Sequence, residues 1–471
     1  MTTTAVQPLK GGFRIGVTCP ACGGELELEK DFFVLTCSHC GSVLRVKLPD
    51  VPAAYMVKKR KQGQEIRFLV DRYCRENGLP LTGGHFQCRS ILYPYWKIDA
   101  VTLKVRHTVY EVDTGAEEEM SIEATTEERE FTSISLTPFE GSCAAGPEIQ
   151  EIPETIGIRA EYLRLIPFSE QNIQGTESFS PIRKSLEQAV AQLTQGLGRL
   201  SAIDSGGKQA NRTDLLHHKG SIVYFPYFTV DATLGSKLAR FAVDGVTGRV
   251  MGHSWMEEMA ELAPESEPLK IEFGALDVTL HRCSNCGVDL KASRAFVYQC
   301  HNCDRIFFME NDPSLSTEIR IATSVQSAKD TLVPFWSIQI PEEFAPQFKR
   351  LFGGIYRSNV LVIPAFQMRN LEAMFRLCKR MSPMAPRLAT SVCEKIGANQ
   401  MPVTVGLDEA MTLTEAIWKR ELAGRNQKDK LSGPSFRPTQ ISLLFAPFHS
   451  QQYFFVDSFS GAVTFERGSL A

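Results

Sequence analysis

CPACGG, residues 19–24, opens a cysteine pattern that recurs three more times along the chain. CSHCG follows at 37–41, and the second half carries a matched pair, CSNCG at 283–287 and CHNCD at 300–304. Fourteen residues lie between Cys22 and Cys37 in the first pair of turns, and thirteen lie between Cys286 and Cys300 in the second. Two cysteines two residues apart place both sulfurs on one side of a turn, and two such turns complete a tetrahedral shell. The sequence therefore predicts two metal sites of four cysteines each.

The expected metal ligands are all cysteines: Cys19, Cys22, Cys37 and Cys40 in the first site, and Cys283, Cys286, Cys300 and Cys303 in the second. Four thiolates leave no coordination position for a substrate, so we expect two structural Zn2+ ions. Iron could use the same four sulfurs, because ligand identity does not separate the two metals. His39 and His301 lie inside cysteine turns, and we expect both to remain outside the coordination shells.

Glycine follows the second cysteine in three of the four turns, where it permits a positive backbone dihedral. The intervening residues 25–35 alternate as a β-hairpin would. With its CPxCG turn at residues 19–23, the first site resembles the rubredoxin-like zinc ribbon. In the second site Ser284 replaces the proline of that motif and Asp304 the usual glycine, but all four ligands are kept.

Composition limits the class of protein. The chain has 471 residues, 43% apolar content and a formal net charge of −3, which predicts two to four domains and no bulk polyanion-binding surface. No stretch of eighteen uninterrupted apolar residues predicts a membrane span. The N-terminal residues do not follow the basic-then-apolar pattern of a secretory leader. We therefore expect a cytoplasmic protein, in which paired cysteines are more often metal ligands than disulfides.

Each half of the chain also contains three short apolar runs around a proline, in the same order. They lie at 92–96, 165–168 and 223–228, and at 332–336, 361–366 and 443–448. Proline cannot donate to a sheet ladder, so we expect edge strands, strand beginnings or bulges. VDGVTGRV at 243–250 and VDSFSGAV at 456–463 then predict matched hairpin turns capped by aspartate. This repetition predicts an internal duplication.

The predicted fold class is α+β and β-rich, with two zinc ribbons that are each followed by a mixed β-rich module. The expected boundaries are ribbon 1 at 13–48, module 1 with helices at 64–256, a linker at 257–270, ribbon 2 at 278–311 and module 2 with helices at 318–471. A pseudo-two-fold arrangement of the two copies is consistent with the repeat. Helices are predicted over 64–77, from Ser180-Pro181 onward, from Asn370 through Met381 and over 413–422.

No phosphate-binding loop, nucleophile elbow or dinucleotide fingerprint is present in the sequence. The ribbons, the proline-aromatic runs and TIGIRA at 155–160 look like a class of poorly characterised bacterial zinc-ribbon proteins without an established activity. We predict a zinc-binding, non-catalytic scaffold or adaptor that mediates protein–protein interaction or complex assembly through exposed edge strands. Two alternatives remain open: nucleic-acid binding through Lys58 to Lys61, and thiol–zinc redox sensing. Partner identity and oligomeric state are left open.

Overall fold

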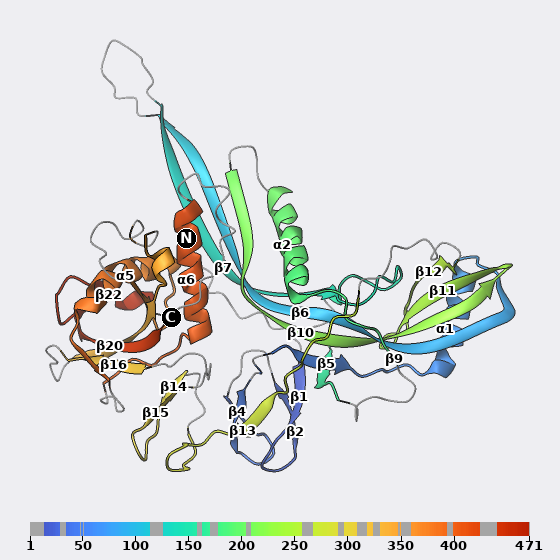
Figure 1. The fold of residues 1–471 in the computed structure, drawn as a ribbon, viewed down its shortest axis with the longest axis horizontal. Coiled ribbons are helices and arrows are strands. Elements are labelled where there is room, and N and C mark those ends of the chain that lie inside the picture. Colours follow the sequence, from blue (N-terminus) through green and yellow to red (C-terminus); the bar gives the residue numbers. More distant parts are fainter. Residues whose placement is uncertain are drawn as a thin grey trace, which may run out of the picture. The chain divides into compact units, whose positions relative to one another are not determined.

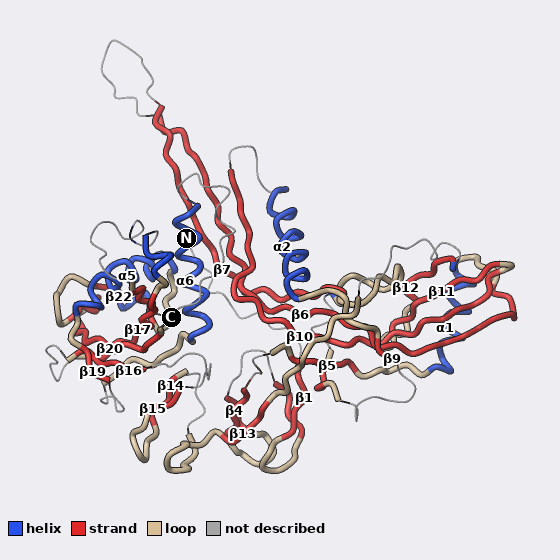
Figure 2. The backbone as a smooth tube through the Cα atoms, in the orientation of Figure 1, coloured by secondary structure: helices blue, strands red, loops and turns tan. Residues whose placement is uncertain are grey.

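The computed structural model describes residues 14–28, 34–47, 49, 51–113, 126–157, 163–169, 178–203, 209–256, 267–290, 296–308, 318–323, 330–346, 349, 359–392, 399–423 and 440–470 (Figure 1). The chain divides into two compact units. Unit 1 comprises 1–100, 138–197 and 218–280, and unit 2 comprises 101–137, 198–217 and 281–471. The described residues are rich in strands and hold few helices (Figure 2). The β-rich α+β class is therefore confirmed.

Unit 1 is built on most of a ten-stranded sheet with the order β12-β11-β10-β5-β8-β1-β2, in which β6 also pairs with β10, β7 and β9. Parts of the long strands β6, β7 and β10 belong to unit 2 instead. A second sheet has the order β13-β4-β3. The elements are β1 (Arg14–Thr18), β2 (Glu25–Leu28), β3 (Val34–Thr36), β4 (Val43–Lys47), β5 (Ala53–Val57), α1 (Gly63–Glu76), β6 (Leu81–Asp113), β7 (Thr126–Ala144), β8 (Arg164–Pro167), β9 (Ser178–Phe179), α2 (Leu186–Ile203), β10 (Gln209–Leu234), β11 (Lys237–Asp244), β12 (Val250–Trp255) and β13 (Asp277–Leu280).

Unit 2 contains a seven-stranded sheet with the order β18-β17-β20-β16-β19, extended by β21 on β20 and β22 on β21. A two-stranded hairpin, β14-β15, carries part of the second cysteine set. The elements are β14 (Val297–Gln299), β15 (Ile306–Phe308), β16 (Glu318–Ala322), β17 (Thr331–Gln339), η3 (Glu342–Phe344), β18 (Val360–Pro364), α5 (Leu371–Met384), η4 (Ala385–Arg387), β19 (Thr390–Val392), α6 (Leu407–Ala423), β20 (Ile441–Ser450), β21 (Phe454–Asp457), β22 (Thr464–Glu466) and η5 (Arg467–Ser469).

All four predicted helices exist, but α2 starts later than expected and α6, predicted over 413–422, starts earlier, at Leu407. The amides of Glu372 and Ala373 donate to the side chain of Asn370, which therefore caps α5 as predicted. Helix α2 does not open at Ser180-Pro181. It begins at Leu186, where the Ser185 hydroxyl accepts from the Gln188 amide and the Gln188 side chain accepts from the Ser185 amide. This reciprocal capping box defines the helix start more strongly than proline does.

The proline runs were expected to form edge strands, strand beginnings or bulges, and the first of these alternatives is wrong for β10 and β20, which are central strands. Residues 442–445 of β20 pair with β16 and residues 448–450 pair with β21, so Pro447 lies where the neighbouring strand changes. Pro226 has the same place in β10, between the residues that pair with β5 and those that pair with β11. A residue without an amide proton is tolerated there because one ladder has ended and the next has not begun.

The carbonyl oxygens of four of these prolines each accept one backbone hydrogen bond. Ala145 donates to Pro94 at 3.0 Å and Ala365 to Pro334 at 3.0 Å. Gly245 donates to Pro226 at 2.9 Å and Ser458 to Pro447 at 3.0 Å. The same local arrangement therefore occurs twice in each unit.

Further hydrogen bonds match between the units. The Trp96 indole donates to the Lys184 carbonyl at 2.7 Å, and the Trp336 indole to the Val405 carbonyl at 2.9 Å. The amides of 183 and 184 both donate to the Ala145 carbonyl, just as those of 404 and 405 donate to Ala365. Both tryptophans are buried, at 1% and 2% exposure, so these bonds satisfy polar groups inside the cores.

One predicted correspondence between the two halves is wrong. The run at 165–168 was paired with 361–366, but strand β8 adds antiparallel to β5, as β19 does to β16. Strands β5 and β16 are in turn the parallel neighbours of β10 and β20. The position of 165–167 therefore corresponds to 390–392. Strand β18 instead matches the end of β7. Strand β7 is followed by Ala145, whose amide donates to the Pro94 carbonyl, and β18 by Ala365, whose amide donates to the Pro334 carbonyl.

We predict that Asp457→Ala lowers the free energy of unfolding of unit 2 by about 2–4 kcal/mol. The carboxylate is 1% exposed and accepts from the amides of Phe459, Ser460, Gly461 and Val463. Denaturant titration measures the change. Ser460→Ala is the control, because it removes only the hydroxyl bond to the same carboxylate at 2.9 Å. Equal losses in the two variants would contradict the turn-capping role.

Candidate metal centres

The structure gathers the eight predicted ligands into two clusters, Cys19, Cys22, Cys37 and Cys40, and Cys283, Cys286, Cys300 and Cys303. Within each cluster the four sulfur atoms lie within 4.8 Å of one another. The sulfurs of Cys19 and Cys40, and those of Cys22 and Cys37, are 3.8 Å apart. In the second cluster the pairs Cys283–Cys303 and Cys286–Cys300 are 3.6 Å apart. A tetrahedron with metal–sulfur bonds of about 2.3 Å has edges of about 3.8 Å. The spacing therefore fits one tetrahedrally coordinated ion per cluster.

All four cysteine turns have the same backbone geometry. In each, the amide of the first cysteine donates to the carbonyl five residues later, and the amide four residues later donates back to that cysteine, at 2.8–2.9 Å. The residue after the second cysteine has a positive φ, +72° at Gly23, +76° at Gly41, +73° at Gly287 and +56° at Asp304. Aspartate tolerates the left-handed region better than most side chains, which explains why Asp304 can replace glycine.

The first cluster is held by two hairpins that share a very small core. The β1-β2 hairpin carries Cys19 and Cys22, and Cys37 and Cys40 flank the turn between β3 and β4. Apart from Cys19 and Cys37, the buried apolar residues of this core are Leu26 and Leu44. So few apolar side chains contribute little to folding, and a bound ion would supply the missing stability.

A strand distant in sequence completes this ribbon. Strand β13, residues 277–280, pairs antiparallel with β4, with Leu280 opposite Leu44. The predicted range of ribbon 2 begins at residue 278 and therefore includes residues that belong to the sheet of ribbon 1. Val278 and Leu280 pack against its core, so the segment that precedes Cys283 adds apolar cover to the first metal centre.

The second cluster uses its own hairpins. An isolated bridge joins Arg282 to Asp289, whose side chains form an exposed ion pair at 2.7 Å. Strands β14 and β15 flank the turn that carries Cys300 and Cys303. His281 is 2% exposed and lies edge-on to Tyr298, with ring centroids 4.6 Å apart. These contacts hold the two cysteine turns of ribbon 2 against each other.

Neither histidine of the cysteine turns belongs to a cluster, as expected. His39 Nε2 lies 3.1 Å from the Glu25 carbonyl oxygen, so this ring bonds to backbone. His301 is exposed on its turn. Of the other cysteines, Cys74, Cys143 and Cys378 are buried among apolar side chains, in agreement with a packing role, while Cys88 is partly exposed. Cys393 lies outside the described residues.

Polar neighbours favour the thiolate form of three ligands, Cys40, Cys286 and Cys303, and at Cys303 the Arg305 amide is the main cause that lowers the pKa. Ser42 lowers the pKa of Cys40 to about 6, first through its hydroxyl and then through its backbone amide. The Asn302 side chain, followed by the Val288 amide, lowers the pKa of Cys286 to about 6. In the same clusters the neighbouring Cys40 sulfur raises the pKa of Cys22 to about 12, and burial raises the pKa of Cys300 to about 11. Because the thiolate is the form that binds metal, a metal ion must displace protons from these two ligands at neutral pH.

A groove beside the first ribbon was not expected from the sequence. It has a volume of about 540 Å³, and its lining includes Gly16 to Thr18 of β1 together with Lys58, Lys59, Arg60 and Arg164. The amides of Arg60 and Lys61 both donate to the Gly245 carbonyl, at 3.0 and 2.9 Å. The basic run, which the sequence offered as a nucleic-acid-binding segment, is therefore attached to the aspartate turn of unit 1.

No protein-family model, curated protein or solved structure matches this chain. The resemblances to the rubredoxin-like ribbon and to the bacterial zinc-ribbon class thus rest on the motif residues. Among the described residues, none of the helices combines the length and the apolar character needed to cross a membrane.

We predict that Cys22→Ser and Cys286→Ser each reduce bound metal from two equivalents to one, because a shell that loses a thiolate binds zinc much more weakly. Elemental analysis of purified protein measures the ratio. Hydrogen exchange should show lost protection chiefly in the ribbon that carries the substitution. Cys88→Ala, which changes a cysteine outside both clusters, should retain two equivalents. Full metal content in Cys22→Ser would refute the assignment of that ligand.

Proposed function

We propose that this chain is a zinc-binding, non-catalytic scaffold or adaptor that presents a shaped surface to a partner protein. The observation that carries the proposal is the closed sulfur tetrad, found twice. All four donors of each cluster come from cysteines, and the sulfur spacing suits a single four-coordinate ion. Such centres stabilise folds and leave no open position for a reacting group.

Zinc is the proposed metal at both centres. Four thiolates also suit iron, but zinc has no redox chemistry and accepts tetrahedral sulfur sites without geometric preference from d electrons. The redox alternative retains one supporting feature, because Cys22 and Cys40 are exposed and open to oxidants. The scaffold proposal requires only that the ions hold the ribbons folded.

We further infer that the two units descend from one duplicated module. The proline carbonyl bonds, the tryptophan indole bonds and the paired amides that donate to Ala145 and Ala365 recur in the same relative places. The aspartate turns match as well, since Asp244 accepts from Val246 and Thr247 and Asp457 from Phe459 and Ser460. Each unit adds one helix of its own, α1 in unit 1 and α5 in unit 2.

The groove beside ribbon 1 is the partner surface that we propose. Its lining holds four basic side chains and one acidic one, Glu25, which gives a formal charge of +3. Arg164 is paired with Glu25 at 3.0 Å, whereas Lys58 and Arg60 are exposed. The β1-β8 ladder ends at Ile15 and Leu165, and the next residues of β1 line the groove. An extended acidic segment of a partner protein suits this combination of strand backbone and positive charge.

Nucleic acid is the second candidate occupant, because the same cations could neutralise phosphates. The twelve groove-lining residues include no aromatic side chain on which a base could stack. The charge therefore favours any polyanion, while the apolar strand residues Val17, Val57 and Ile166 favour a polypeptide.

We predict that the chain binds a glutamate-rich ten-residue peptide and that Lys58→Glu with Arg60→Glu weakens the affinity at least tenfold, because both changes reverse charge at the groove. Fluorescence anisotropy at two salt concentrations measures the affinity for the peptide, and a ten-nucleotide RNA is the competing ligand. Affinity for the peptide should fall with salt. The control is Arg72→Glu with Arg376→Glu, which makes the same charge change on exposed helix positions. Tighter binding of RNA than of peptide would favour the second candidate, and equal effects of the two double variants would exclude the groove.

A further inference from the structure

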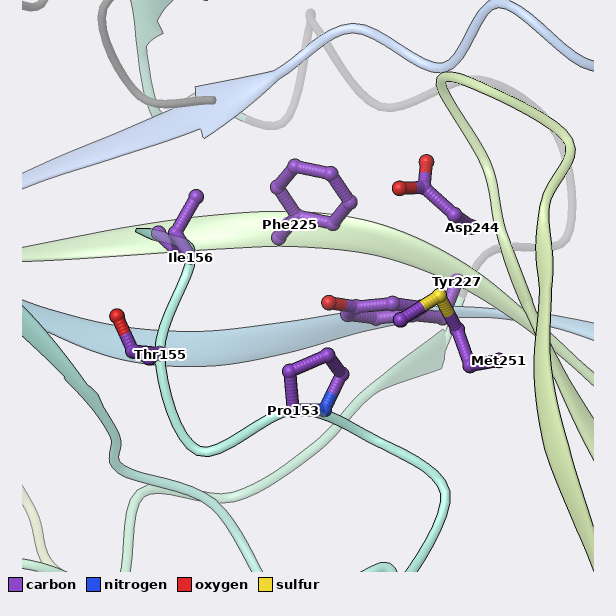
Figure 3. Close-up of a pocket in the computed structure, with 7 residues that line it drawn as sticks. All are labelled: Pro153, Thr155, Ile156, Phe225, Tyr227, Asp244 and Met251. Atoms are coloured by element: carbon purple, nitrogen blue, oxygen red, sulfur yellow. The ribbon is translucent and has the colours of Figure 1, made fainter. Parts of the chain in front are cut away.

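Unit 1 contains a cavity of about 240 Å³, shown in Figure 3, whose lining includes none of the eight clustered cysteines. Its walls come from β10 through Phe225 and Tyr227, from the end of β11 through Asp244, from β12 through Met251, and from the loop that contains Pro153 and Ile156. The cavity is smaller than the roughly 300–1,000 Å³ of pockets that hold drug-sized ligands. Its dimensions suit a small molecule.

The hydrogen bonds around the cavity have a defined direction. The Tyr95 hydroxyl donates to the Pro153 carbonyl at 2.9 Å, which uses its single proton. The Tyr227 hydroxyl lies 3.0 Å from the Tyr95 hydroxyl and must therefore donate to it. Burial is the main cause that raises the pKa of Tyr95, so the Tyr95 hydroxyl stays protonated. The Tyr227 proton thus points to Tyr95, and the Tyr227 side chain lines the cavity.

Negative charge and aromatic faces characterise the lining. Asp244 is the one ionisable carboxylate among the lining residues, which include no lysine, arginine or histidine. Its Oδ1 atom accepts from the Val246 and Thr247 amides at 2.8 and 2.9 Å, which holds the side chain at the wall. The rings of Phe225 and Tyr227 have centroids 5.0 Å apart. A carboxylate beside two aromatic rings is a favourable environment for a cation.

The corresponding region of unit 2 is packed with phenylalanine. The residue before the matched tryptophan is Tyr95 in unit 1 and Phe335 in unit 2. The residue after the matched proline is Tyr227 in unit 1 and Phe448 in unit 2. These rings lie 6.0 Å apart, and Phe465 lies 5.5 Å from Phe448. Unit 1 instead buries two tyrosines, at 0% and 3% exposure, although a buried hydroxyl costs free energy unless it is bonded. The two copies thus differ in polarity at this site while they share the aspartate turn.

We propose that this cavity binds a small organic ammonium ion. The charged head lies near the Asp244 carboxylate and the faces of Phe225 and Tyr227, and the apolar body contacts Ile156 and Met251. Charge attraction and cation–π interaction select a cation over a neutral molecule of the same shape. This inference does not depend on the groove beside ribbon 1 or on the identity of the metal.

n-Butylammonium is the probe, with n-butanol as the neutral molecule of nearly equal shape, and both are titrated into the full-length protein followed by NMR. We expect n-butylammonium to bind at least tenfold more tightly than n-butanol. Asp244→Asn should weaken n-butylammonium at least tenfold, because it removes the charge but keeps an oxygen for the turn amides. Asp457→Asn makes the same change in the matched turn of unit 2 and should leave the affinity unaltered.

Tyr227→Phe gives a second, independent readout, since unit 2 already folds with Phe448 at the matched position. It should weaken n-butylammonium and leave n-butanol unchanged. The proposal would be overturned if n-butylammonium and n-butanol bound equally, or if Asp244→Asn and Asp457→Asn had equal effects. It would also be overturned if n-butylammonium did not saturate the site at about 50 mM, since a site of roughly millimolar affinity would be filled at that concentration. The metal content of every variant should remain that of the parent protein.

Discussion

The gathering of four cysteine sulfurs within 4.8 Å of one another is the constraint on which the rest of this structure depends. The apolar cluster that encloses Cys19 and Cys37 of ribbon 1 buries Leu26 and Leu44 as its other members, and such a small core contributes little folding free energy by apolar burial alone. Its strands nevertheless extend the main sheet, since β1 pairs with β8. A metal ion at the sulfur tetrad therefore stabilises one wall of the basic groove as well as the ribbon. Under the proposed function, loss of the metal would therefore disturb the groove as well as the ribbon.

Outside the ribbons, main-chain hydrogen bonds explain why the two units share a pattern with little shared sequence. A proline in the middle of a central strand is tolerated because the neighbouring strand changes there, and its carbonyl binds the incoming chain, as Gly245 and Ser458 show. An aspartate then caps the following turn. These requirements constrain proline, aspartate and a few small residues, while core side chains such as Tyr227 and Phe448 remain free to diverge. Unit 1 has a cavity lined by Tyr227 and Asp244 here, whereas unit 2 has the packed rings of Phe335, Phe448 and Phe465.

Local features could be predicted from the sequence, and features that join distant segments could not. The cysteine turns, the aspartate turns and the Asn370 cap each depend on a few consecutive residues. The start of α2 was missed although Ser185 and Gln188 carry the spacing of a capping box, because the proline at 181 suggested an earlier start. The pairing of β13 with β4 and the change of neighbour at Pro447 depend on segments far apart in the chain. No local pattern indicates either one.

X-ray absorption at the zinc edge is the most direct test of the central claim, applied to purified protein with its metal content measured in parallel. The account predicts two zinc ions per chain, each with four sulfur neighbours at about 2.3 Å and no nitrogen or oxygen ligand. The same experiment distinguishes iron, which would give its own absorption edge. A mixed shell of sulfur with oxygen or nitrogen, or a chain that folds fully without metal, would contradict it.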